Sequence, residues 1–290
     1  MLISVIVPFR NESAYIRSCV TALANQTIKK DRYELFFVDN GSTDRSAEIV
    51  KTTDPQAHVL EEKAGGQYAA RNAGLGLAKG EWIAFTDGDC AVANDWLERI
   101  IDHASKSKAD IILGPSRFAG RGGFLEYLEN YENLKLEYVC KRRSPAIFGH
   151  ANNMAIRSEV FRRAGLFGET RFAEDTTFIH RAYERYPGLK VSFCDTMVIT
   201  HLEIKTWRDW ARKILLYAKT STLAHYRNTH HRTLTWHERL EIAHQLKKQF
   251  PITKRRSFQY FVGLCLLGIL FDLKKIIESI KCLIARTNPV

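Results

Sequence analysis

The chain has 290 residues, of which 45% are hydrophobic and 26% charged, a composition typical of a globular protein and not of a disordered or fully membrane-embedded one. Its formal net charge is +11, and the excess lies at one end: residues 1–204 hold 26 Lys and Arg against 27 Asp and Glu, whereas residues 205–290 hold 17 against 5. This asymmetry indicates a basic appendage for nucleic acid or an anionic membrane surface, with a solvated helical face as the alternative.

The first 115 residues alternate short apolar runs with segments of helical spacing. The expected strands are Ile3–Val7, Glu34–Val38, His58–Leu60, Trp82–Phe85 and Asp110–Leu113. The expected helices are Ala14–Leu23, Ala47–Val50, Tyr68–Ala78 and Trp96–Ile101, with Ser13 and Ser42 as N-caps of the first two. This rhythm predicts an α/β fold with a mainly parallel sheet covered by helices.

The rest of the chain is mixed at first and then helical. Residues 116–204 are expected to hold helices at Phe124–Val139 and Ser158–Ala164, a loop at Phe148–Asn153, and strands at Lys190–Phe193 and Met197–Thr200. Beyond them we expect helices at Trp207–Leu223 and His237–Gln249, a break at Pro251, and an apolar run at Phe258–Phe271.

Three of the predicted strands end in polar residues. These ends are Pro8–Glu12, Asp39–Asp44 and Thr86–Cys90. Ligands of open parallel sheets bind beyond the carboxyl ends of the strands. Asp87 and Asp89, one residue apart on a tight turn, can meet a hard divalent cation, which prefers oxygen ligands; a plain turn is the alternative.

These stretches resemble the family 2 glycosyltransferases. The matching segments are Ser4–Glu12, Val38–Asp44, Ala69–Gly74, Phe85–Asp89 and Phe172–Asp175, in the family's order and spacing, and they cover about residues 1–204. The resemblance implies a GT-A fold, inversion at the anomeric carbon, and a divalent cation, Mg²⁺ or Mn²⁺.

The resemblance also implies roles for single residues on the donor side. Pro8, Phe9 and Glu12 would line the pocket for the base and ribose, Asp39 would bind the base, Arg71 would lie near the base and diphosphate, Asp87 would face ribose and metal, and Asp89 would ligate the metal. Two of these have simpler readings, because Phe9 could be a core residue and Arg71 a helix-surface charge.

On the acceptor side, the resemblance makes Asp175 the candidate general base, since an inverting transfer needs a carboxylate within reach of the attacking hydroxyl. Its neighbour Glu174 is expected to contact substrate, and a plain acidic pair at a helix N-terminus is the alternative. Asn152 could hold sugar hydroxyls or simply form a turn. His201 could complete the metal site, which would favour Mn²⁺, or be structural.

The apolar run near the C-terminus is 14 residues long, shorter than the roughly 18–20 that span a bilayer. Its flanking cations, Lys254, Arg255, Arg256, Lys274 and Lys275, favour a helix lying in the membrane interface. The alternative is a helix packed on the catalytic domain or on a second subunit. Apolar residues within this basic segment favour lipid over nucleic acid.

The sequence therefore predicts an inverting glycosyltransferase that moves a sugar from a UDP- or GDP-sugar to a lipid-linked or glycan hydroxyl. Residues 1–204 would form the catalytic domain, with a nucleotide-binding half at 1–115 and an acceptor half at 116–204, and residues 205–290 a helical, basic, membrane-associated extension. Scattered cysteines and a strand beginning at once predict a protein without a signal peptide, on the cytoplasmic face of a membrane. The rivals are a sugar-nucleotide pyrophosphorylase, which would carry a Gly-rich, Arg-containing loop after the first strand, and a non-catalytic, membrane-docked nucleotide-sugar binding protein.

Overall fold

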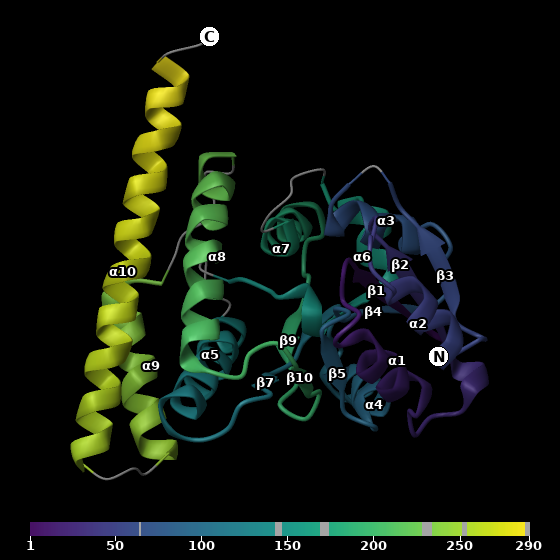
Figure 1. The fold of residues 1–290 in the computed structure, drawn as a ribbon, viewed down its shortest axis with the longest axis horizontal. Helices are drawn as coiled ribbons and strands as arrows, with labels where there is room; N and C mark the ends of the chain where they lie inside the picture. The colour runs from purple at the N-terminus through teal and green to yellow at the C-terminus, as the bar shows by residue number, and fades with distance from the viewer. Residues whose placement is uncertain (64, 143–146, 169–173, 228–233, 251–253, 288–290) are drawn as a thin grey trace.

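The computed structural model describes residues 1–63, 65–142, 147–168, 174–227, 234–250 and 254–287. Figure 1 shows an α/β body beside a group of long helices. The body consists of β1 (Ile3–Phe9), α1 (Ile16–Ala24), β2 (Tyr33–Asp39), α2 (Ser46–Thr53), β3 (His58–Glu61), α3 (Gln67–Leu75), β4 (Trp82–Phe85), β5 (Cys90–Val92), α4 (Trp96–Ser107), β6 (Ile111–Leu113), β7 (Ser116–Phe118), β8 (Met154–Arg157), α6 (Ser158–Ala164), α7 (Glu174–Arg185), β9 (Val191–Phe193) and β10 (Ile199–His201). The long helices are α5 (Gly123–Lys141), α8 (Trp207–Arg227), α9 (Trp236–Gln249) and α10 (Lys254–Thr287).

The main sheet has seven strands in the order β3-β2-β1-β4-β8-β6-β9, and only β8 runs antiparallel to its neighbours. Its register pairs Phe9 with Asp39 and Ile6 with Phe85. The carboxyl ends of β1, β2 and β4 therefore meet at one edge, where ligands of such sheets bind. The predicted α/β fold with a mainly parallel, helix-flanked sheet is confirmed.

Both faces of this sheet are covered, because its central strands divide their side chains between two cores. Along β1, Ile3, Val5 and Val7 pack with α1 and α4, whereas Ile6 belongs to the core formed with α3, α5, α6 and α7. Alternation of side chains along a strand produces this division. It also explains why β1 reads as a continuous apolar run, as strands covered on both faces do.

A second sheet of three strands has the order β5-β10-β7. Its strand β10 pairs antiparallel with β5 and parallel with β7. The sequence analysis did not predict β5, β7 or β8. Their sequences, CAV, SRF and MAIR, are not runs rich in β-branched or aromatic residues, which was the signal used for the other short strands.

The expected N-caps were wrong, because α1 follows Tyr15 and α2 follows Arg45, and neither helix has a side-chain cap. Ser13 instead donates its backbone N–H to Asp44, and the Ser42 hydroxyl accepts the backbone N–H of Asn11. These serines join the loop after β1 to the loop after β2.

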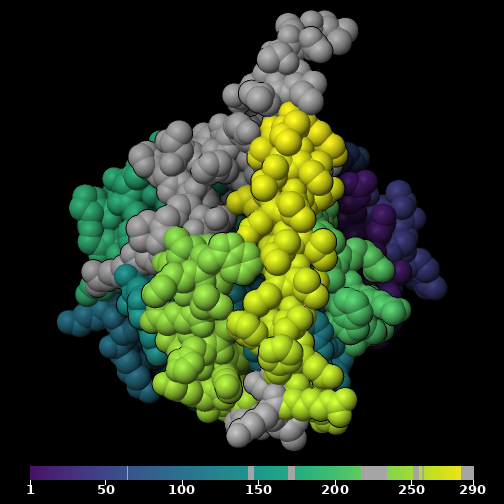
Figure 2. All heavy atoms as spheres, turned by 90° about the vertical axis from the view of Figure 1, so that its left-hand side faces the viewer, coloured from purple at the N-terminus to yellow at the C-terminus, as the bar shows by residue number. Residues whose placement is uncertain are grey.

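The helix α10 is covered on one side and open on the other. Tyr260 lies 5.5 Å, between ring centroids, from both Phe124 and Tyr127 of α5, and Arg239 of α9 forms a bidentate ion pair with Asp272 at 2.9 and 3.1 Å. The opposite side faces outward along the surface shown in Figure 2. None of the described helices is apolar over a length sufficient to span a bilayer.

Candidate active site

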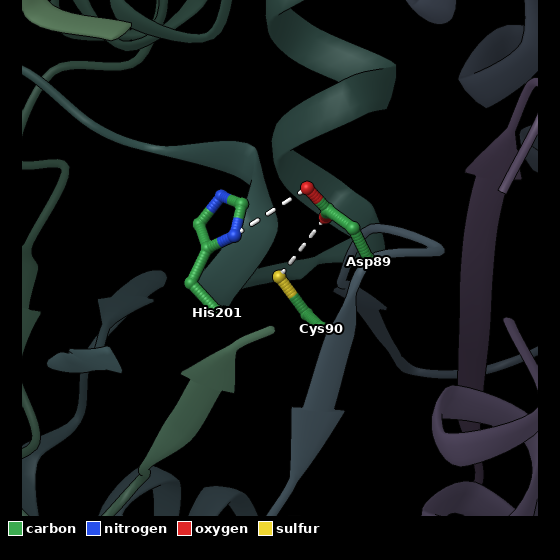
Figure 3. A group of neighbouring side chains, drawn as sticks. All are labelled: Asp89, Cys90 and His201. Atoms are coloured by element: carbon green, nitrogen blue, oxygen red, sulfur yellow. Dashed lines mark hydrogen bonds and ion pairs between the residues drawn. The ribbon is translucent and has the colours of Figure 1, made fainter. Parts of the chain in front are cut away.

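Strand pairing brings together residues that lie more than a hundred positions apart. In the second sheet His201 is paired with Cys90, and the Leu202 N–H donates to the Asp89 carbonyl at 2.9 Å. Ligand atoms of Asp89, Cys90 and His201 consequently lie within 4.8 Å of one another (Figure 3). The resemblance-based expectation that His201 lies beside Asp89 agrees with this geometry.

Cys90 is a member of this cluster that the sequence analysis missed. Its thiol donates to Asp89 Oδ1 at 3.4 Å. Burial, with the nearby charges of Asp89 and Asp87, raises the pKa of this thiol well above its ordinary value. The hydrogen bond from this thiol helps to fix the orientation of the Asp89 carboxylate. The position of Cys90 directly after the Asp-Gly-Asp turn was the available signal.

His201 has the character of a ligand. Its Nδ1 lies 3.4 Å from Asp89 Oδ2 and has no hydrogen-bond partner among the described residues, although it is buried. Burial, together with the neighbouring Lys213 ammonium, lowers the pKa of His201 to about 4. The imidazole is therefore neutral near pH 7, the form that binds metals.

The glycine between the two aspartates is needed for close packing. A Cβ on Gly88 would lie 2.8 Å from Phe9 Cβ and 3.3 Å from Glu12 Cγ. This contact holds the turn against Glu12, whose pKa is raised to about 8 by burial and by the charges of Asp89, Glu203 and Asp87. Such a concentration of carboxylates, with a neutral imidazole, fits a divalent cation with oxygen and nitrogen ligands.

Asp87 has a different partner. Its Oδ1 accepts from Arg71 Nη2 at 2.6 Å, and Arg71 is only 1% exposed. The reading of Arg71 as a surface charge is therefore wrong: helix α3 directs it inward. Its Nε and Nη1 atoms are buried without a hydrogen-bond partner among the described residues, and N–H groups in that situation suit an anionic ligand. Metal ligation by Asp87 stays a prediction.

Asp175 lies at the start of α7, with both carboxylate oxygens engaged. Oδ1 accepts from the Tyr68 hydroxyl at 3.3 Å, and Oδ2 accepts from the Ala151 N–H at 3.2 Å. Tyr68 in turn lies under the Arg71 guanidinium, which is 5.2 Å from its ring centroid. Asp175 is thus connected to Arg71, and through it to Asp87.

Its neighbour Glu174 is 2% exposed and has structural partners. Its Oε1 accepts from the Gly168 N–H at 2.7 Å and from Arg181 Nη1 at 3.0 Å. These contacts fasten the first turn of α7. They support the alternative of a helix-terminal acidic residue for Glu174, and its contact with substrate stays a prediction.

The two adjacent asparagines have different surroundings. Asn153 holds the backbone together, donating to the carbonyls of Pro115 at 2.8 Å and Met197 at 2.7 Å and accepting from Trp96 Nε1 at 2.9 Å. Asn152 keeps a buried Oδ1 without a hydrogen-bond partner among the described residues. Asn152 is therefore the one suited to bind a hydroxyl group.

The expected base-pocket residues lie at the ends of β1 and β2. Phe9 is 3% exposed and belongs to the core beside α1. Its neighbour Pro8 is also buried, as are all residues of β1. Asp39 accepts the Ser42 N–H at 2.8 Å and stays partly accessible. The core reading of Phe9 fits its burial, and nucleotide contacts by Pro8, Phe9 and Asp39 stay predictions.

The mostly parallel, helix-flanked seven-stranded sheet is a GT-A-like fold. Residues 4–165 match the family model described as Glycosyl transferase family 2. The match covers more than half of the chain. The chain therefore belongs to this family.

Curated relatives carry the same kind of name. The chain is 33% identical over 171 residues to Glycosyltransferase AglE of Haloferax volcanii, covering 57% of this chain and 55% of that protein. It is 30% identical over 198 residues to Glycosyltransferase GlyG of Streptococcus pneumoniae, covering 63% and 65% respectively. The chain thus spans less than two thirds of either relative.

Solved structures share the fold. The mannosyltransferase PcManGT of Pyrobaculum calidifontis, in complex with GDP-Man and Mn²⁺, aligns with a TM-score of 0.67 at 16% identity, over 96% of this chain and 86% of that one. S. aureus TarS 1-349, in complex with UDP-GlcNAc, aligns with a TM-score of 0.55 at 19% identity, over 96% and 89%. At these identities the likeness concerns the fold alone.

Proposed function

We propose that the protein transfers a sugar from a nucleoside-diphosphate sugar to a hydroxyl acceptor with inversion, using Asp175 as the general base. One observation carries this proposal: contacts run without a break from Asp175 through Tyr68 and Arg71 to Asp87. A base for the acceptor and cationic groups for the leaving diphosphate therefore share one edge of the sheet.

The chemistry follows from this arrangement. Asp175 accepts the proton of the acceptor hydroxyl while that oxygen attacks the anomeric carbon, and the bond to the diphosphate oxygen breaks on the opposite face. The buried Arg71 guanidinium offers N–H groups to the negative charge that grows on the leaving group. A divalent cation held by Asp89 and His201 would supply further neutralisation of that charge.

The donor is a nucleotide sugar, with UDP- and GDP-sugars as the candidates. Fold neighbours solved with GDP-Man and with UDP-GlcNAc support this choice. A thermal-shift panel of UDP- and GDP-sugars with Mn²⁺ tests it, because a ligand specific to the folded state raises the melting temperature. We expect one base class to stabilise the wild type in a metal-dependent way, and Asp89→Ala to lose this effect. Metal-dependent stabilisation that survives in Asp89→Ala would contradict the assignment.

We further propose that α10 docks on the cytoplasmic face of a membrane, which would bring the enzyme to a lipid-linked acceptor. Large apolar side chains, all at least 38% exposed, recur every three or four residues along the helix, twice as adjacent pairs, and form a stripe: Phe258, Val262, Leu266, Ile269, Leu270, Leu273, Ile276, Ile277 and Ile280. The exposed cations Arg255, Arg256 and Lys281 accompany it. An apolar face with flanking cations is the pattern of interfacial helices.

Co-sedimentation with anionic liposomes tests this docking. The double variant Leu266→Glu/Leu273→Glu places two charges in the stripe and should lose most of its binding, because each charge must enter the headgroup region. The matched control is Leu77→Glu/Leu166→Glu, which alters two leucines of similar exposure on the α/β body and should sediment like the wild type. Equal sedimentation of both double variants would exclude the stripe as the membrane surface.

A further inference from the structure

A lysine from the helical region reaches into the metal-ligand cluster. Lys213, on α8, places its Nζ 2.6 Å from His201 Nε2, 3.7 Å from Asp89 Oδ2 and 3.2 Å from Glu203 Oε1. Its side chain is 21% exposed. The helix that carries it lies outside residues 4–165, the part that matches the family model. Two of the three cluster members thus contact one ammonium group.

This contact selects a tautomer of His201. An ammonium nitrogen can only donate, so His201 Nε2 must be the acceptor and carry the lone pair. In a neutral imidazole the proton then lies on Nδ1, the nitrogen that faces Asp89. A protonated Nδ1 has no lone pair for a cation. Metal binding at Nδ1 therefore requires the Lys213 ammonium to leave Nε2.

Charge acts in the same direction. A cation bound between Asp89 and His201 and an ammonium within 3.7 Å of Asp89 repel each other, and the repulsion is strong where water is largely excluded. Asp89 and His201 are 7% and 4% exposed. The nearby Glu203 offers Lys213 a carboxylate that is 42% exposed and lies outside the cluster.

We propose that Lys213 is a built-in competitor of the divalent cation. In the metal-free enzyme its ammonium occupies Asp89 and His201, and metal binding displaces it toward Glu203. This inference rests on the proposed metal site. Beyond that site, it makes the metal affinity depend on Lys213 of α8 as well as on the metal ligands themselves.

The test is a titration of the full-length protein with Mn²⁺ alone, with free Mn²⁺ followed by electron paramagnetic resonance. Lys213→Met keeps an unbranched side chain and removes the charge, so this variant should bind Mn²⁺ about tenfold or more tightly than the wild type. Lys213→Arg keeps the charge and should stay near the wild-type affinity. The matched control is Arg212→Met, since Arg212 is 81% exposed on the same helix and pairs with Asp209.

Three results would overturn the inference: unchanged or weaker Mn²⁺ binding by Lys213→Met, equal tightening by Arg212→Met, or tightening by Lys213→Arg. If Lys213→Met fails to melt cooperatively, Lys213→Gln takes its place. Failure of the underlying metal site looks different: neither the wild type nor the lysine variants would bind Mn²⁺, or Asp89→Ala would bind it as the wild type does.

Discussion

The α/β body and the helices α8 to α10 differ in charge balance and in the apolar surface that they expose. The body balances its charges and buries its strands on both faces, whereas residues 205–290 carry 17 Lys and Arg against 5 Asp and Glu and expose a stripe of apolar side chains. The body contains the residues that we propose for the chemistry, and α10 carries the surface that we propose for membrane docking. Lys213 is an exception to this division, because it lies on α8 and contacts Asp89 in the candidate site.

The largest effect should come from the body alone. Asp175→Asn is nearly isosteric, and because it removes the proton acceptor we expect kcat to fall by about 10²–10⁴. Donor affinity should persist, since the base serves the acceptor. Steady-state kinetics and nucleotide binding on one preparation measure both. The control is Glu184→Gln, further along α7, which should turn over like the wild type. If Asp175→Asn turns over within a few-fold of the wild type, Asp175 is not the general base.

The next effect belongs to the helices. A chain that ends at Phe250 lacks α10, so it should lose liposome binding and also melt at a lower temperature, because the contacts of Tyr260 and Asp272 are gone. The stripe variant Leu266→Glu/Leu273→Glu should lose liposome binding with little change in melting temperature. Co-sedimentation and thermal melts separate the two functions of α10. If the truncated chain still sediments, membrane binding resides elsewhere.

A smaller effect on kcat should come from Tyr68, whose hydroxyl donates a hydrogen bond to Asp175. Tyr68→Phe removes the hydroxyl that donates to Asp175 at 3.3 Å, and loss of one such hydrogen bond corresponds to a decrease in kcat of about fivefold. The control is Tyr33→Phe, which removes a buried hydroxyl that donates to the Leu23 carbonyl, away from the site. It shows how much the loss of a buried tyrosine hydroxyl changes kcat through stability alone. A drop in donor affinity at unchanged kcat would show that Tyr68 acts on the nucleotide instead.

The smallest effect is a pH dependence of stability. Because the pKa of Glu12 is raised to about 8 from 4.5, the folded chain holds a proton that the unfolded chain has released between those values. The free energy of unfolding therefore falls as pH rises from about 4.5 to 8. Glu12→Gln cannot ionise and should melt about 2–4 °C above wild type near pH 8.5, a value reduced for solvent screening. Near pH 4.5 the two should melt alike; parallel melting curves across this range would contradict the shift.

Much of the body could be predicted because its signals are local. The strands of the main sheet are apolar runs with polar ends, and those ends are where Asp39, Asp87 and Asp89 lie. Asp175 followed from the resemblance at a helix start, and α7 does begin at Glu174. The boundaries of α6 and of β4 agree with the expected ranges.

What could not be predicted depends on pairing between distant segments. Nothing local distinguishes Asn152 from Asn153, yet only the second is bound by Trp96 and two carbonyls. The burial of Arg71 depends on the packing of α3 against β1 and β2, and the position of Lys213 depends on the packing of α8. Which side of α10 is exposed could not be predicted either, because it depends on the contact of the other side with α5.

The pairing of His201 with Cys90 has a consequence for the order of assembly. A ribosome makes the chain from the N-terminus, so β5 emerges long before β10, which begins at Ile199. Loop closure over such a span costs entropy and is slow. A nascent chain or a protease fragment ending before Ile199 contains every strand of the main sheet but lacks one wall of the cation cluster. The cation cluster can therefore be completed only after Ile199–His201 have been synthesised, when all strands of the main sheet are already present.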